Sequence, residues 1–258
     1  MRGSSIVQLI GSLTKDSELR YTPGGLAILE VNVAGNQSIQ TKDGVKDVPF
    51  YIRAKVMGKY AEALADDLSE GTVVAVDGRL DYRSWETPEG QKRSAVEVFA
   101  SSITTLTGDF AFVKDSRGQN RLVGGTNTVA LMGNLTRDPE LRYTPGGDAV
   151  TRLTVAINEK YRGKDGEVER THFIDVTAWR EVAEKAADFT KGAPVRVTGR
   201  ITNESWEDSE GNKRYATRVE AAEVYAVARP ESKEARPAKA SKTPDLDEEF
   251  PPEEDLPF

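Results

Sequence analysis

The sequence predicts an all-β protein made of two copies of one small five-stranded barrel, each with one short helix, followed by a disordered acidic tail. Three observations predict this fold: a loop motif that occurs twice, strand patterns that recur around both copies, and a change of composition near residue 229. At 258 residues, the chain is long enough for two domains that each bury a core.

The repeated motif reads SELRYTPGG at residues 17–25 and PELRYTPGG at residues 139–147, an offset of 122 residues. Proline fixes φ at the second corner of a tight turn, and we expect the glycine at the third corner, Gly24 or Gly146, to supply a positive φ. A turn of this kind joins two antiparallel strands. The motif therefore predicts the same hairpin in both copies.

Alternating apolar and polar side chains place five strands in the first copy. We expect these strands at residues 5–13, 26–34, 49–57, 72–85 and 92–104, with a helix at 59–69 that Gly71 ends. The segment 35–46 is polar, and we expect it to be flexible, with a hairpin tip at residues 42–44. The order β-β-β-α-β-β is that of an OB-fold, a five-stranded barrel.

The same pattern returns from Asn127, and the sequence VDGR at residues 76–79 recurs as VTGR at residues 197–200. We therefore predict OB-fold domains at residues 1–105 and 127–228, a linker at 106–126 and a disordered tail at 229–258. Within the linker, Phe110, Phe112 and Val113 are apolar enough to lie against a domain.

The net charge of −7 is located in the tail. Residues 245–258 contain seven acids and no base, which leaves 35 acids and 35 bases in the rest of the chain. A block of one sign is typical of a disordered interaction tail. The composition of residues 229–244, rich in Pro, Ala, Ser, Lys and Glu, also cannot bury enough apolar surface to offset the loss of chain entropy.

The composition argues against several classes of function. The chain has no cysteine and one histidine, His172, which we expect to be structural. Gly124-Gly125 lacks the Lys-Ser/Thr ending of a phosphate-binding loop. No apolar run reaches the ~18 residues of a membrane span, and no signal peptide is recognisable. We expect a soluble cytoplasmic protein without catalytic residues, metal or other cofactor.

Strand parity identifies a polar face, because alternate side chains of a strand point to opposite sides. In the third strand, Phe50 and Ile52 belong to the apolar phase and Tyr51 and Arg53 to the polar phase. Applied to strands three and four of both copies, parity gives these aromatic and basic residues on the polar face: Tyr51, Arg53, Lys55, Arg79, Arg83, Trp85, Phe173, Trp179, Arg196, Arg200 and Trp206.

Aromatic rings interleaved with Lys and Arg favour one ligand class, single-stranded nucleic acid. Bases stack on the rings, cations contact phosphates, and stacking is indifferent to base identity. Further aromatic and basic residues lie in loops or at strand ends near them: Arg20, Tyr21, Lys42, Lys92, Arg93, Arg142, Tyr143, Arg162, Lys164, Lys213 and Arg214. The alternative is structural: the rings cover a barrel end or a subunit interface, and the loop cations are merely solvated.

The sequence resembles bacterial single-stranded DNA-binding protein. The resemblance rests on LIGSL at residues 9–13 and ELRYTPGG at 18–25, on LMGNL at 131–135 and RDPELRY at 137–143, and on the acidic tail that ends in Leu-Pro-Phe. It covers about residues 1–105, 127–228 and the tail. Two OB-folds in one chain resemble the subgroup that forms a homodimer with four OB-folds.

This resemblance implies sequence-independent binding and protection of single-stranded DNA during replication, recombination and repair, at the nucleoid. It implies stacking at Tyr161, Phe173, Trp179 and Trp206, whereas the equivalents in the first copy are Ile39, Tyr51, Met57 and Trp85. It also implies that the tip of the tail, Asp255, Leu256, Pro257 and Phe258, binds replication and repair proteins.

Two other functions remain open from the residues alone. One is an OB-fold module that binds oligosaccharide or protein. The other is an OB-fold nuclease, which needs a clustered site of acids and metal that the sequence does not display.

Overall fold

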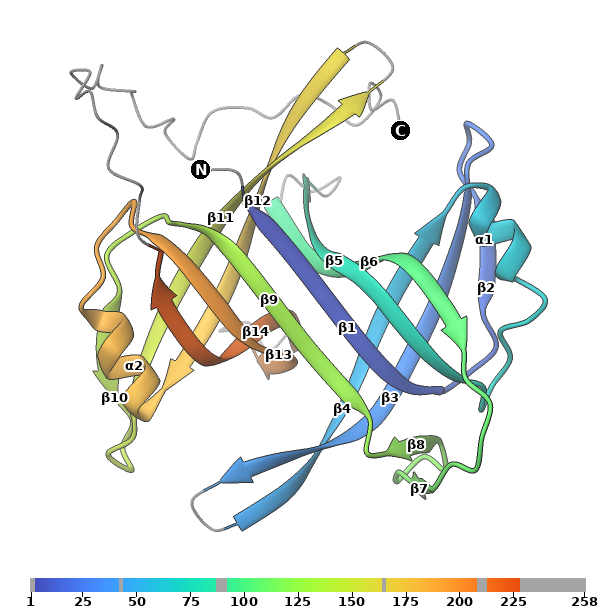
Figure 1. Cartoon of the computed structure of the whole chain (residues 1–258), viewed down its shortest axis with the longest axis horizontal. Coiled ribbons are helices and arrows are strands. Elements are labelled where there is room, and N and C mark those ends of the chain that lie inside the picture. Colours follow the sequence, from blue (N-terminus) through green and yellow to red (C-terminus); the bar gives the residue numbers. More distant parts are fainter. Residues whose placement is uncertain (1–2, 42–43, 87–91, 164–165, 208–212, 228–258) are drawn as a thin grey trace.

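The computed structural model describes residues 3–41, 44–86, 92–163, 166–207 and 213–227. The predicted tail, including its tip at residues 255–258, and the predicted contacts Lys42 and Lys164 lie outside these residues. Two barrels lie side by side in Figure 1, each with one helix on its outer side, and the prediction of two tandem OB-folds is confirmed.

The two barrels repeat one order of elements. The first contains β1 (Ser4–Leu13), β2 (Glu18–Tyr21), β3 (Ala27–Thr41), β4 (Gly44–Met57), α1 (Lys59–Leu64), β5 (Val73–Glu86) and β6 (Lys92–Thr105). The second contains β9 (Thr126–Leu135), β10 (Glu140–Tyr143), β11 (Ala149–Gly163), β12 (Gly166–Trp179), α2 (Arg180–Ala187), β13 (Pro194–Glu207) and β14 (Lys213–Ala226). Each barrel closes through one parallel pair, β4 with β6 and β12 with β14.

Strand parity predicts the core correctly. Phe50, Ile52, Ala54 and Val56 of β4 are at most 6% exposed, and Ile174, Val176 and Ala178 of β12 at most 1%. Thr177 is an exception, since it lies in the polar phase but is only 7% exposed. The alternation thus separates a packed interior from a face of rings and charges.

The described residues of the segment 35–46, which are 35–41 and 44–46, form strands and not a flexible loop, contrary to the sequence prediction. β3 and β4 pair continuously from Ile28↔Met57 to Thr41↔Gly44 and project as a long hairpin, as β11 and β12 do in the other barrel (Figure 1). A two-stranded ribbon satisfies its backbone groups across the pair, so it tolerates polar side chains on both faces. A polar sequence therefore does not exclude strands here.

The first helix is also shorter than predicted. It ends at Leu64, and turns occupy the following residues, where Leu68 is only 2% exposed. Gly71, with φ 84°, lies in the connection to β5 and does not end the helix directly. Leu68 reaches the core from the non-helical connection between α1 and β5, so its apolar character gave a misleading signal for helix.

The repeated Pro-Gly-Gly motif forms the predicted turn between antiparallel strands, β2 with β3 and β10 with β11. The positive φ, however, belongs to Gly25 (81°) and Gly147 (84°), one position later than predicted. The N–H of Gly25 donates to the carbonyl of Thr22 at 2.8 Å. This is the pattern of a type I turn followed by a left-handed glycine.

The linker contains a hairpin that the sequence did not predict, with β7 (Phe112–Lys114) and β8 (Asn120–Val123). β8 pairs in parallel with β3, so the linker lies against the first domain. The residue that packs there is Leu122, 4% exposed, whereas Phe112 and Val113 are 42% and 37% exposed.

The two barrels share one sheet, because β1 pairs antiparallel with β9 from Ser4↔Met132 to Ile10↔Thr126. Figure 1 shows these two strands adjacent at the centre of the molecule. Among the described residues, no helix is long and apolar enough to cross a membrane.

His172 of the second domain is buried against the first, as expected of a structural residue. Its Nδ1 accepts the backbone N–H of Tyr82 at 3.1 Å, so its Nε2 is left to face Glu159 at 3.6 Å. Hydrogen bonding from His172, together with the charge of Arg79 from the first domain, lowers the pKa of Glu159 despite its partial burial. These contacts join the domains beyond the shared sheet.

Candidate nucleic-acid interface

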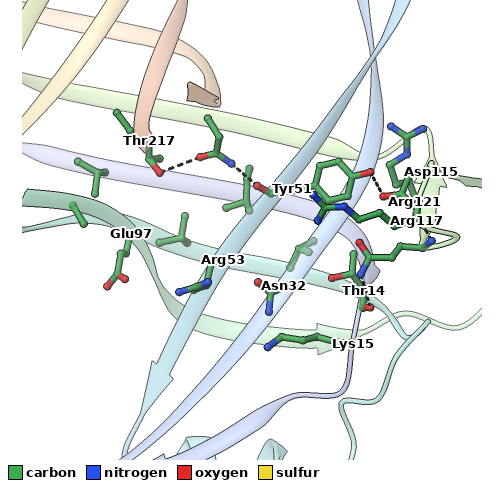
Figure 2. Close-up of a pocket in the computed structure, with 18 of the residues that line it drawn as sticks. Thr14, Lys15, Asn32, Tyr51, Arg53, Glu97, Asp115, Arg117, Arg121 and Thr217 are labelled. Atoms are coloured by element: carbon green, nitrogen blue, oxygen red, sulfur yellow. Dashed lines mark hydrogen bonds between the residues drawn. The ribbon is translucent and has the colours of Figure 1, made fainter. Parts of the chain in front are cut away.

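A groove of about 1060 Å³ lies where the first domain, the linker hairpin and the second domain meet (Figure 2). β4 contributes Tyr51 and Arg53, the second domain contributes Phe173, and the hairpin contributes further basic residues. The basic residues that line the groove are Lys15, Arg53, Lys114, Arg117 and Arg121. The acidic ones are Glu97, Asp115 and Asp175, so cations predominate.

Tyr51 is held at the hairpin side of the groove. Its hydroxyl donates to Oδ2 of Asp115 at 2.7 Å, and the guanidinium of Arg121 lies 5.9 Å from the ring centre. Burial and the hydrogen bond to Asp115 raise the pKa of Tyr51, whereas that hydrogen bond lowers the pKa of Asp115. The pair is therefore a neutral phenol and a carboxylate at neutral pH, and the ring remains 38% exposed.

Phe173 brings the second domain to the same groove. Its ring meets Tyr82 of the first domain edge to face, with centres 5.9 Å apart. Nearby, the side-chain amide of Asn203 donates to the carbonyl of Tyr51 at 2.5 Å and its oxygen accepts the hydroxyl of Thr217. Two predicted stacking positions from different copies, Tyr51 and Phe173, thus lie along one groove that crosses the domain boundary.

The basic residues on the polar face differ in their availability. Arg53 has a side chain that is 58% exposed and only a 4.0 Å contact with Glu30. Lys55 has a 13% exposed side chain, and its Nζ lies 2.7 Å from Oε2 of Glu97. A phosphate at Lys55 would have to compete with that carboxylate, whereas Arg53 faces the groove.

Arg79 and Arg200 are likewise engaged within the protein. Arg79 lies 4.6 Å from the ring centre of Phe99 and 3.4 Å from Glu159 of the second domain. Arg200 has a 19% exposed side chain that binds Glu220 at 2.7 Å. Both are placed to stabilise the fold in this structure, and their contact with DNA stays a prediction.

The Arg-Tyr pairs of the repeated motif are accessible but do not line the groove. Tyr21 and Tyr143 are 58% and 63% exposed. Arg20 pairs with Glu18 and Glu30, and Arg142 donates to Glu140 at 2.8 Å. The motif thus presents exposed rings beside partly neutralised cations.

Two of the three tryptophans, Trp85 and Trp179, lie outside the groove lining. Trp85 and Trp179 are each 39% exposed, and Trp179 directly precedes α2. For the other predicted contacts the structure gives the backbone alone: Tyr161 and Arg162 lie in β11, Lys92 and Arg93 in β6, Trp206 in β13, and Lys213 and Arg214 in β14.

Sequence reasoning missed Lys114, Arg117 and Arg121, because it treated residues 106–126 as a connection. One signal was available, since the sequence DSRG at residues 115–118 is typical of a turn. The described residues contain no group of three or more His, Asp or Glu arranged to hold a metal ion.

Comparison with known proteins identifies the family. The sequence profile of the Single-strand binding protein family matches residues 5–106 and 126–227. The chain is 48% identical to the single-stranded DNA-binding protein of Thermus aquaticus over 271 aligned residues, covering 100% of this chain and 99% of that protein. It is 47% identical to the Deinococcus radiodurans protein of that name over 231 aligned residues, 88% of this chain and 77% of that protein.

A solved structure agrees with the sequence relatives. The wild-type single-stranded DNA binding protein from Thermus aquaticus matches with a TM-score of 0.73 and 42% identity, over 91% of this chain and 98% of that one. The fold, the tandem repeat and the length of the alignments all indicate the same family. This chain belongs to the single-strand binding protein family.

Proposed function

We propose that the chain binds and protects single-stranded DNA without sequence preference during replication, recombination and repair. The groove between the domains carries this proposal, because the exposed ring of Tyr51 lies there beside Arg53 and three cations of the linker. The names of the relatives support it. The function is binding, and no catalytic step is assigned to any residue.

The mechanism combines two kinds of contact. Each base stacked on a ring contributes roughly 1–3 kcal/mol, and each neutralised phosphate releases counterions and makes the affinity depend on salt. Both contacts ignore base identity. The alternative of a neutral oligosaccharide ligand is less favoured, because a groove with more basic than acidic side chains suits a polyanion.

The proposal extends to assembly and partners. Two chains form a homodimer with four OB-folds, which light scattering would detect as twice the 28.3 kDa of one chain. The protein acts in the cytoplasm at the nucleoid, and the tip of its acidic tail binds replication and repair proteins. The concentration of seven acids in residues 245–258 supports a tail that basic partner surfaces recognise.

Tryptophan fluorescence tests DNA binding directly. The chain has three tryptophans, and all of them, Trp85, Trp179 and Trp206, are candidate stacking residues. We expect poly(dT) to quench their emission strongly, a DNA duplex to quench it less, and a neutral oligosaccharide to leave it unchanged. Quenching by the oligosaccharide but not by poly(dT) would reject the proposed function. Gel analysis of the DNA after incubation with Mg²⁺ is the control for cleavage.

Removal of the last four residues, Asp255 to Phe258, separates the two proposed activities of the chain. We expect the truncated protein to lose binding to replication and repair proteins and to keep its affinity for poly(dT) or bind slightly tighter, since one acid, Asp255, and the terminal hydrophobes are removed. Pull-down assays and salt-controlled titrations measure the two effects. Loss of DNA binding on truncation would refute this division of roles.

A further inference from the structure

The linker hairpin is fixed to the first domain by contacts along its length. β8 pairs with β3 at Gly35↔Leu122, and the side chain of Leu122 is buried. The hydroxyl of Ser12 donates to the carbonyl of Asn120 at 2.9 Å, and Gln119 Nε2 donates to the carbonyl of Thr14 at 3.3 Å. The hairpin therefore behaves as part of the folded domain, so its side chains have defined positions.

Asp115 connects the turn of the hairpin to the groove. Its Oδ1 accepts the backbone N–H groups of Arg117 at 2.8 Å and Gln119 at 2.9 Å, which fixes the turn. Its Oδ2 accepts the hydroxyl of Tyr51. One carboxylate thus holds both the turn and the ring, and Figure 2 shows Arg117 and Arg121 on the same side of Tyr51.

Three cations of the hairpin, Lys114, Arg117 and Arg121, line this side of the groove. Within the described residues, none of the three forms an ion pair with a carboxylate, and Arg121 acts on Asp115 only at longer range, where its charge helps to lower the pKa of that carboxyl. This contrasts with Lys55, which is neutralised by Glu97 at 2.7 Å. Cations without a close carboxylate beside an exposed ring are the arrangement that binds a phosphate next to a stacked base.

The two domains differ in how they can hold DNA. The first has Ile39 and Met57 at two positions where the second has Tyr161 and Trp179, so it offers fewer rings for stacking. The hairpin lies against this poorer domain, adjacent to its Tyr51. The cations of the linker therefore lie beside the domain that has fewer rings.

We propose that the linker hairpin is a phosphate-binding site, in which Lys114, Arg117 and Arg121 hold the backbone of a single strand that passes from Tyr51 toward Phe173. This inference rests on the proposed function and adds a site to it. The hairpin contributes charge and position, and the OB-folds contribute the stacking surfaces.

The test compares two triple variants of the full chain that lose the same charge. In the first, Lys114, Arg117 and Arg121 are each changed to Gln. In the matched control, Lys59→Gln, Lys185→Gln and Lys191→Gln remove three exposed cations that do not line the groove. Affinity for poly(dT) is measured across a range of NaCl concentrations, and thermal unfolding checks that both variants are folded.

We expect the dependence of log K on log[NaCl] to become shallower by about 2 in the hairpin variant, since each single-strand phosphate contact contributes roughly 0.7. The control variant should change this slope much less. Arg117→Gln alone, at an exposed turn position, should make the salt slope shallower by about 0.7. This single variant replaces the triple variant in the test if the triple variant unfolds.

Equal slopes for the hairpin and control variants would overturn the hairpin site while leaving DNA binding in place. Failure of the unmodified chain to bind poly(dT) would overturn the proposed function itself, and the hairpin site with it.

Discussion

Trp206→Ala is expected to weaken binding of poly(dT) by about 2 kcal/mol, roughly 30-fold, and Trp85→Ala by clearly less. Trp206 belongs to the domain with aromatic residues at all four implied stacking positions, including Tyr161 and Trp179. We therefore expect this domain to supply more of the stacking energy. Around Trp85, two of the four positions are Ile39 and Met57, so the first domain has fewer rings for stacking.

The comparison of the two tryptophans is meaningful because they occupy equivalent positions in SWE at residues 84–86 and 205–207. Both substitutions are measured at one salt concentration against one length of poly(dT), with circular dichroism to confirm folding. Replacement by Phe in each position is the control, since a smaller ring still stacks and should recover most of the affinity. A larger loss for Trp85→Ala would contradict unequal sharing of the DNA.

Gly199→Ala is expected to destabilise the second domain by about 3 kcal/mol. A Cβ at this position would lie 2.0 Å from the carbonyl oxygen of Glu220 and 3.0 Å from the Cα of Ala221. Both atoms belong to the backbone of β14 at the bulge between Thr198 and Gly199, so they cannot move without breaking the pairing. Urea unfolding followed by circular dichroism measures the loss.

Gly146→Ala is the matched control for this substitution. Gly146 has no positive φ, and the nearest atom to its added Cβ is Thr144 Oγ1 at 3.8 Å. We expect Gly146→Ala to change the free energy of unfolding of the protein by no more than about 0.5 kcal/mol. Similar losses for both glycines would show that the bulge tolerates a side chain. Gly78 is the equivalent glycine of the first domain. We expect Gly78→Ala to be equally destabilising, because the added Cβ would lie 2.2 Å from the carbonyl oxygen of Phe99.

The sequence predicts the interior well because burial on one face of a strand leaves a period of two. Alternation along β4 and β12 assigns Ile52 and Ile174 to the interior, and both are buried. The repeat adds a second reading of each strand, and the two OB-folds are confirmed, although each barrel also contains a short strand, β2 or β10, that the predicted order lacked. Local periodicity and repetition together determine the fold.

The candidate site depends on contacts that local patterns do not encode. Arg53 and Lys55 share one strand and one phase, yet Lys55 is held by Glu97 from β6 and Arg53 faces the groove. The linker hairpin depends on the side chain of Asp115 and on a parallel pairing with β3, which joins residues far apart in sequence. Tertiary placement therefore decides which cations are available.

The pairing of β1 with β9 within one chain also changes what can evolve at that boundary. Two separate copies that meet about a twofold axis must present self-complementary surfaces, whereas fused copies can diverge on each side. Here His172 and Glu159 occupy positions that correspond to Phe50 and Gln37 in the first copy. Because β1 and β9 belong to one chain, their effective concentration is high and their pairing does not depend on the protein concentration. Each half of the chain can therefore acquire its own contacts.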